Sequence, residues 1–136
     1  MTNIYKLHSI AYQKYKLTID EIEEFKESLN RLIGAINAHD SSEEHNKNIV
    51  NRFLKDNLYM EDRYEINTHD RIDTGIIDNS NLKVIIEYKA TKNKNQMPTV
   101  DNLNKIALAE VMLYYIREKD RGNESITNII ITNSYE

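Results

Sequence analysis

Two acidic residues and a lysine stand where they could share one chemical task. Asp73 lies in the segment 71–78, and Glu87 and Lys89 close the segment 82–89. If both segments are β-strands, alternate residues project from the same face, so Glu87 and Lys89 share a face of the second strand. The pattern therefore predicts two carboxylates with an ammonium group beside them.

The length of the turn between the two segments decides whether Asp73 faces Glu87. If residues 79–81 form a three-residue hairpin loop, Asp78 lies opposite Leu82. Counting back along both strands then places Asp73 opposite Glu87. Directly opposed residues project to the same face, with Cβ atoms about 4.5–5.5 Å apart. A slip of one residue would send Asp73 to the other face.

Carboxylates this close repel each other, and a small hard cation between them removes the repulsion. Mg²⁺ prefers oxygen ligands and keeps waters and substrate phosphate oxygens in its shell. Such an ion can polarise a phosphate and lower the pKa of an attacking water. Lys89 could orient that water or offset charge in the transition state. We therefore expect a site for Mg²⁺, with Mn²⁺ as a substitute, at Asp73 and Glu87.

The same residues also fit a plainer structure, a solvated strand face with cross-strand ion pairs. Two features argue against it. The charged pair follows the apolar run 84–86, and strands this apolar are usually central and covered on both faces. A charged pair at the end of such a strand, with Asp73 facing it, is unusual without a chemical role.

Helices are expected before these strands and after them. Thr18 and Glu21 have capping-box spacing ahead of a helix over about 19–38. Polar residues at 40–42 can cap a second helix that runs to about 58. Asp101 is expected to cap a third long helix, which ends at Gly122.

Strands are expected at four places: 64–67, 71–78, 82–89 and 126–132. The resulting element order is α, α, β, β, β, α, β. An antiparallel meander followed by a crossover helix and another strand predicts an α/β fold with a mixed β-sheet of about four strands flanked by helices.

Composition bounds the class of protein. A chain of 136 residues suits one domain. It has no cysteine, which favours a reducing cytoplasm, and it shows neither a signal peptide nor an apolar run that suits a membrane span. The formal net charge of −4 argues against a strong grip on nucleic acid by this domain alone.

Asp73 together with Glu87-Tyr88-Lys89 resembles the signature of the PD-(D/E)xK nuclease superfamily, although Ile72 stands where that signature has proline. Over roughly residues 18–136 the chain is similar to the N-terminal nuclease domain of type IIG restriction–modification enzymes. The stretches that carry this similarity are 42–45, 53–56, 64–67, 84–89, 101–104, 113–118 and 130–133.

This resemblance implies a restriction-endonuclease-like core and Mg²⁺-dependent hydrolysis of double-stranded DNA, as in type II restriction enzymes. It implies a single nuclease domain over 1–136, with an N-terminal helical segment over 1–40 and the catalytic core over 41–136. The domain would be the N-terminal fragment of a larger prokaryotic cytoplasmic protein. Its partners would be the methyltransferase and target-recognition parts of that protein, and it could dimerise on DNA.

The family often adds an acidic residue from the helix before the meander, and Glu43 and Glu44 compete for this role. Glu43 lies seven residues before Val50 and so shares its inward face. We therefore expect Glu43 to join Asp73 and Glu87 as a metal ligand. The alternative is that both glutamates merely favour the positive end of the helix dipole. On the third helix, Glu110 is expected at the surface, with a place beside the site as its alternative.

Two other functions stay open. One is another nuclease of the same superfamily, such as a repair or junction-resolving enzyme, although the acidic balance speaks against a resolvase. The other is a catalytically degenerate domain that keeps the fold and binds DNA or a partner. The intact Asp73, Glu87 and Lys89 argue against the second alternative.

Overall fold

The structure, a computed structural model, describes residues 16–38 and 42–135. The predicted helical segment over 1–40 therefore lies partly outside the described residues. The helices are α2 (Ile19–Ala38), α3 (Glu43–Asn57) and α4 (Ile106–Asp120), with a short 3-10 helix η2 (Lys94–Gln96). The strands are β1 (Tyr64–His69), β2 (Ile72–Asp78), β3 (Asn81–Tyr88) and β4 (Asn128–Thr132).

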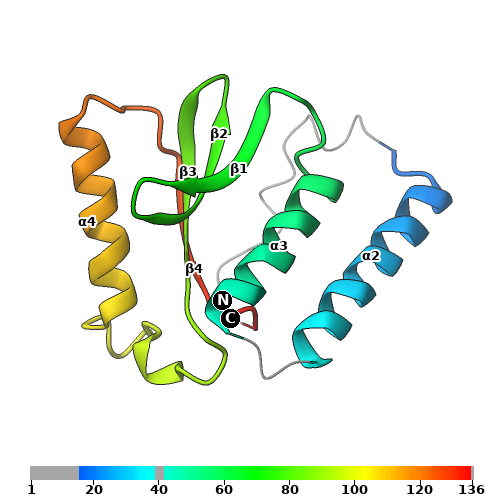
Figure 1. Ribbon diagram of the computed structural model, residues 1–136, viewed down its shortest axis with the longest axis horizontal. Coiled ribbons are helices and arrows are strands. Elements are labelled where there is room, and N and C mark those ends of the chain that lie inside the picture. The colour runs from blue at the N-terminus through cyan, green and yellow to red at the C-terminus, as the bar shows by residue number, and fades with distance from the viewer. Residues whose placement is uncertain (1–15, 39–41, 136) are drawn as a thin grey trace.

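The four strands form one mixed sheet in the order β1-β2-β3-β4. The first three make an antiparallel meander, and β4 pairs parallel to β3 after the crossover through α4. Figure 1 shows α4 on one side of the sheet and α3 on the other, with α2 packed outside α3. The predicted α/β class, with a four-stranded mixed sheet flanked by helices, is confirmed.

Strand β3 is central and apolar on both faces, as its sequence predicts. Its face toward α4 carries Ile85, which is fully buried with Val111 of the helix. Its other face carries Val84, Ile86 and Tyr88, which pack against residues of α3. Glu87 is therefore on the α4 side of the sheet, and the alternation expected for the end of β3 holds.

The β2–β3 turn differs from the expected three-residue loop. Asp78 pairs with Asn81 rather than Leu82, so the turn has two residues, and both have positive φ angles of 48° and 66°. Positive φ at both central positions is the backbone of a tight type I′ hairpin turn. A β-bulge at Lys83 then adds one residue to β3, because Ile77 pairs with Leu82 and Ile76 pairs with Val84.

Helix starts show where local sequence decides the structure. Thr18 and Glu21 form the expected capping box, with backbone-to-side-chain hydrogen bonds of 2.8 and 3.2 Å. Ser42 caps α3 by accepting the His45 N–H. The expectation that Asp101 caps the third helix is wrong, because α4 begins only at Ile106.

The segment before α4 explains that late start. Residues Thr99 and Asn102 bridge each other through both backbone N–H groups, and the Asn102 side chain accepts the backbone N–H of Asn104. These local turns give the backbone N–H groups hydrogen-bond partners in a non-helical conformation. Asparagine and threonine side chains often stabilise such turns in competition with a helix. Within residues 16–38 and 42–135, no helix is long and apolar enough to cross a membrane.

Helix α3 is anchored to the sheet by a polar contact as well as by apolar packing. The Asn51 side-chain oxygen accepts hydrogen bonds from the Thr74 hydroxyl at 3.0 Å and from the Tyr88 hydroxyl at 3.4 Å. Thr74 is fully buried, so this contact satisfies a polar group that would otherwise lose its water. The anchor fixes the middle of α3 against β2 and the carboxyl end of β3.

Candidate functional site

The candidate site lies at the carboxyl end of β3, where several elements meet. Figure 1 shows that both α3 and α4 begin at this end of the sheet and that β4 also ends there. Helix N-termini carry partial positive charge and favour negative side chains nearby. The fold therefore gathers the ends of two strands and the beginnings of two helices around the Glu87 and Lys89 side chains.

Asp73 and Glu87 are opposite each other on neighbouring strands. Thr74 pairs with Ile86, so one further step along each strand brings Asp73 beside Glu87. The register expected for this pair is thus present, although the turn that produces it is shorter than expected. One Asp73 carboxylate oxygen accepts the Tyr88 backbone N–H at 3.0 Å, which orients the carboxylate along the end of β3.

Glu87 is the buried member of the pair, with a side chain that is 4% exposed. One of its carboxylate oxygens contacts Lys89, while the other, Oε2, is buried and has no hydrogen-bond partner among the described residues. Burial, and next the negative charge of Asp73, raise the pKa of Glu87 to about 7, against the pull of Lys89. Burying a carboxylate oxygen without a partner is costly, so this atom is suited to receive a cation.

Lys89 lies between two carboxylates. Its Nζ is 2.5 Å from Glu87 Oε1 and 2.8 Å from Glu110 Oε2, and its side chain is 8% exposed. Burial alone would lower the pKa of Lys89, but the carboxylates of Glu110 and Glu87 outweigh it and raise that pKa. Lys89 is therefore a fixed ammonium group, suited to donate hydrogen bonds and to stabilise negative charge rather than to act as a base.

Glu110 was expected at the surface, and that expectation is wrong. Its side chain is only 36% exposed and contacts Lys89 from the second turn of α4. Its neighbours at helical spacing, Ala107 and Tyr114, also lie toward the sheet. The buried spacing of Ala107 and Val111 could have indicated this from the sequence, because Glu110 borders the same stripe of the helix.

Tyr114 is a second residue that the sequence did not place near the acidic group. It packs partly buried against the α4-side core. Burial raises the pKa of its hydroxyl, and the negative charges of Glu87 and Glu110 raise it further. The tyrosine ring therefore forms one wall beside the carboxylates.

Glu43 and Glu44 point to different surroundings, as expected. The Glu43 carboxylate accepts the backbone N–H of Ala90, the residue after Lys89, at 3.1 Å. Glu44 is 67% exposed and pairs with Lys47 at 2.5 Å within α3. The structure thus brings Glu43 to the end of β3 and leaves Glu44 outside.

The donor set fits a hard divalent cation in part. Asp73 and Glu87 supply neighbouring carboxylates, and the unpartnered Glu87 oxygen is the atom that a cation would satisfy. Among the residues that the structure describes, however, no group of three or more His, Cys, Asp or Glu side chains is arranged to hold a metal ion. Glu43 therefore stands near the pair without completing a three-carboxylate cluster.

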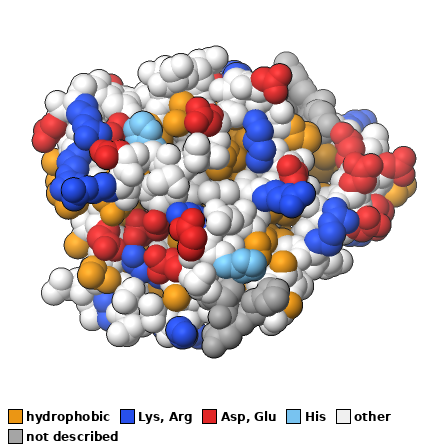
Figure 2. All heavy atoms as spheres, in the orientation of Figure 1, with side chains coloured by type: hydrophobic (Ala, Val, Ile, Leu, Met, Phe, Trp, Pro, Cys, Tyr) orange, Lys and Arg blue, Asp and Glu red, His pale blue; other side chains and the backbone are white. Residues whose placement is uncertain are grey.

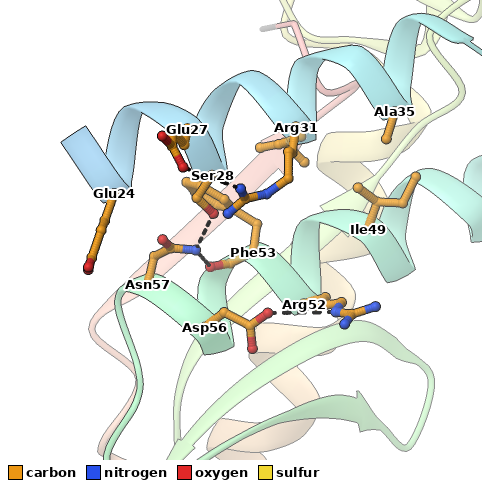
Figure 3. Close-up of a pocket in the computed structure, with 11 residues that line it drawn as sticks. Glu24, Glu27, Ser28, Arg31, Ala35, Ile49, Arg52, Phe53, Asp56 and Asn57 are labelled. Carbon is orange, nitrogen blue, oxygen red and sulfur yellow. Dashed lines mark hydrogen bonds and ion pairs between the residues drawn. The ribbon is translucent and has the colours of Figure 1, made fainter. Parts of the chain in front are cut away.

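In Figure 2, Asp and Glu side chains gather on the side of the molecule where Figure 1 draws α4, with Lys or Arg side chains among them. A separate groove of about 670 Å³ lies between α2 and α3 (Figure 3). Phe53 lines this groove together with Arg31 and Arg52, and each arginine lies beside an acidic residue. Neither Asp73 nor Glu87 lines that groove, so the candidate chemistry and the groove are distinct features.

Comparison with known proteins gives a family without an assigned role. Residues 3–136 match the family model described as a domain of unknown function, DUF7149, and the chain belongs to this family. No curated protein and no solved structure matches the chain.

Proposed function

We propose that this member of the DUF7149 family is a Mg²⁺-dependent endodeoxyribonuclease domain with a restriction-endonuclease-like core, acting within a type II, IIG-like restriction–modification enzyme. The observation that carries the proposal is the nearness of Asp73 and Glu87, which follow the last paired residues Thr74 and Ile86, together with a buried Glu87 oxygen that lacks a partner among the described residues. The Lys89 ammonium beside that pair supplies the third element of the signature.

Each residue has a distinct role in this proposal. Asp73 and Glu87 would hold the metal ion, which when bound polarises the scissile phosphate and acidifies the attacking water. Lys89 presents its ammonium beside that position, where it orients the water and stabilises negative charge as it develops on phosphate oxygens. Glu43 fixes the backbone of Ala90 and thereby the end of β3 that carries Lys89.

DNA contact must come largely from outside the acidic centre. The chain has a formal net charge of −4, and phosphate neutralisation supplies much of the affinity for DNA. Lys92 and Lys94 are exposed in the segment that follows β3, close in sequence to the proposed centre. These two lysines would approach the DNA backbone, and the target-recognition parts of the parent enzyme would choose the sequence.

Cleavage of double-stranded DNA with Mg²⁺ or Mn²⁺ tests this function. Lys89→Ala should abolish cleavage, because no other described ammonium group contacts Glu87, while circular dichroism should show an intact fold. Lys26→Ala, which removes a 59% exposed lysine from α2, is the matched control and should keep most activity. Unaltered cleavage by Lys89→Ala would contradict the proposed role.

A second candidate is a catalytically degenerate domain of the same fold that binds DNA or a partner. The observation that favours it is the ion pair of Lys89 with Glu87 at 2.5 Å, since the ammonium already satisfies one oxygen that a metal would use. Such a domain would neither bind Mn²⁺ nor cleave DNA, whereas its fold would be unchanged. Metal binding by the wild-type protein therefore separates the two candidates.

A further inference from the structure

One contact of the acidic centre has no place in the roles described so far, the ion pair from Glu110 to Lys89. Glu110 comes from α4, whereas Glu87 lies in β3 and Lys89 directly follows the end of that strand. The Lys89 Nζ lies within 2.8 Å of a carboxylate oxygen on each of them. One buried ammonium group therefore has two anionic partners on two separate elements.

The need for the second partner follows from burial. The Lys89 side chain is 8% exposed, so its charge cannot rely on water. Removing one partner from a buried ion pair leaves an uncompensated charge and is strongly unfavourable. If Glu87 directs its carboxylate to a metal ion, the positive charge of Lys89 loses one of its two neighbouring carboxylates. This loss would occur in the metal-bound state, in which the reaction requires Lys89 to stay in place.

Glu110 is placed to supply that compensation. It is half-buried on the second turn of α4, and the neighbouring Ala107 and Val111 are fully buried against the sheet, so the helix cannot easily move away. A lysine side chain has several rotatable bonds and loses its position readily when it is unpaired. A carboxylate on a packed helix restrains it without any change in the backbone.

We propose that Glu110 is a positioning residue, which holds the Lys89 ammonium beside Asp73 and Glu87 when the Glu87 carboxylate engages a metal ion. The reference to the metal ion rests on the function proposed above. The hold on Lys89 does not, because the contact is present in the protein alone. Glu110 thus acts on the reaction through Lys89 and touches neither metal nor DNA.

The test observes the Lys89 ammonium directly, by ¹⁵N nuclear magnetic resonance of the side chain in protein free of metal and DNA. Glu87→Gln removes the first carboxylate and imitates its engagement elsewhere. We expect a slowly exchanging Lys89 ammonium signal in the wild type and in Glu87→Gln. The signal should vanish in Glu87→Gln/Glu110→Gln. The matched control Glu87→Gln/Asp120→Asn, which removes an exposed charge from the far end of α4, should keep it.

Two results would overturn the proposal. One is loss of the signal in Glu87→Gln alone, or its absence from the wild type, since Glu110 would then not hold Lys89. The other is survival of the signal in Glu87→Gln/Glu110→Gln with the amide spectrum of a folded protein. If the double variant fails to fold, the Lys89 ammonium signal of Glu87→Gln, compared with that of the wild type, still decides whether Glu110 holds Lys89.

Activity adds a readout that depends on the proposed function. In an active protein, Glu110→Gln should lower kcat by about tenfold or more and leave KM for DNA nearly unchanged, as expected for a residue that orients a catalytic group. A change in KM alone would contradict a positioning role. If the protein cleaves no DNA, the resonance experiment still decides whether Glu110 holds Lys89, so the two proposals fail separately.

Discussion

The buried carboxyl of Glu87 makes the stability of the metal-free protein depend on pH. Its pKa is raised from the ordinary value of 4.5 to about 7, first by burial and then by the charge of Asp73. Between these pH values the folded protein keeps a proton that the unfolded chain has lost, so stability falls as pH rises. The stabilising contribution is fully present below about pH 4.5 and is lost through about pH 7.

The substitution Glu87→Gln isolates this contribution, because it keeps the size of the side chain and removes the titration. The interval from 4.5 to about 7, at about 1.4 kcal/mol per unit, corresponds to roughly 3.5 kcal/mol. Relative to the variant, the wild type should therefore lose roughly 2 to 3 kcal/mol of unfolding free energy between pH 5 and pH 8.

Urea unfolding in the presence of EDTA, followed by circular dichroism at several pH values, measures this difference. Glu65→Gln on β1 is the matched control, since its side chain is exposed, and its difference from the wild type should stay nearly constant. A wild-type minus Glu87→Gln difference that does not change between pH 5 and pH 8 would refute the reasoning.

Three further predictions concern helix α3, the centre of the sheet and helix α2. In the cleavage assay, Glu43→Gln should lower activity by at least about tenfold, because it removes the negative charge that accepts the Ala90 N–H at the end of β3. Glu44→Gln should change activity little, and the reverse ranking would move the third acid to Glu44. Gly75→Ala should destabilise the fold by about 1–3 kcal/mol, because an added Cβ would lie 2.6 Å from the buried Leu82 side chain. At Gly34 an added Cβ would have no atom within 4 Å, so Gly34→Ala should instead stabilise helix α2 by about 0.5–1 kcal/mol. Thermal unfolding should show a lower melting temperature for Gly75→Ala and a higher one for Gly34→Ala.

The sequence predicts the pairing of Asp73 with Glu87 through a turn that differs from the real one. A two-residue turn alone would have shifted the register by one residue. The bulge at Lys83 restores it, so the two departures from the expected hairpin cancel before Thr74 and Ile86 pair. Turn residues with positive φ at 79 and 80 were not foreseen, because serine seldom adopts this conformation.

The contact of Glu110 with Lys89 does not follow from sequence alternation. Alternation along a strand fixes which side chains share a face, whereas the rotation of α4 on the sheet depends on packing between Val111 and Ile85. Local turns can also override a capping signal. Asp101 lies within the turn closed by the backbone hydrogen bonds between Thr99 and Asn102, and the helix therefore begins only at Ile106. Contacts between elements thus needed the structure.

The most direct test of the central claim is calorimetric titration of the protein with Mn²⁺ or Mg²⁺, on the wild type and on Glu87→Ala. The account predicts saturable binding by the wild type that Glu87→Ala loses and that Glu44→Ala, an exposed carboxylate on α3, retains. No binding by the wild type at millimolar metal, or equal binding by Glu87→Ala, would contradict a metal site at Asp73 and Glu87.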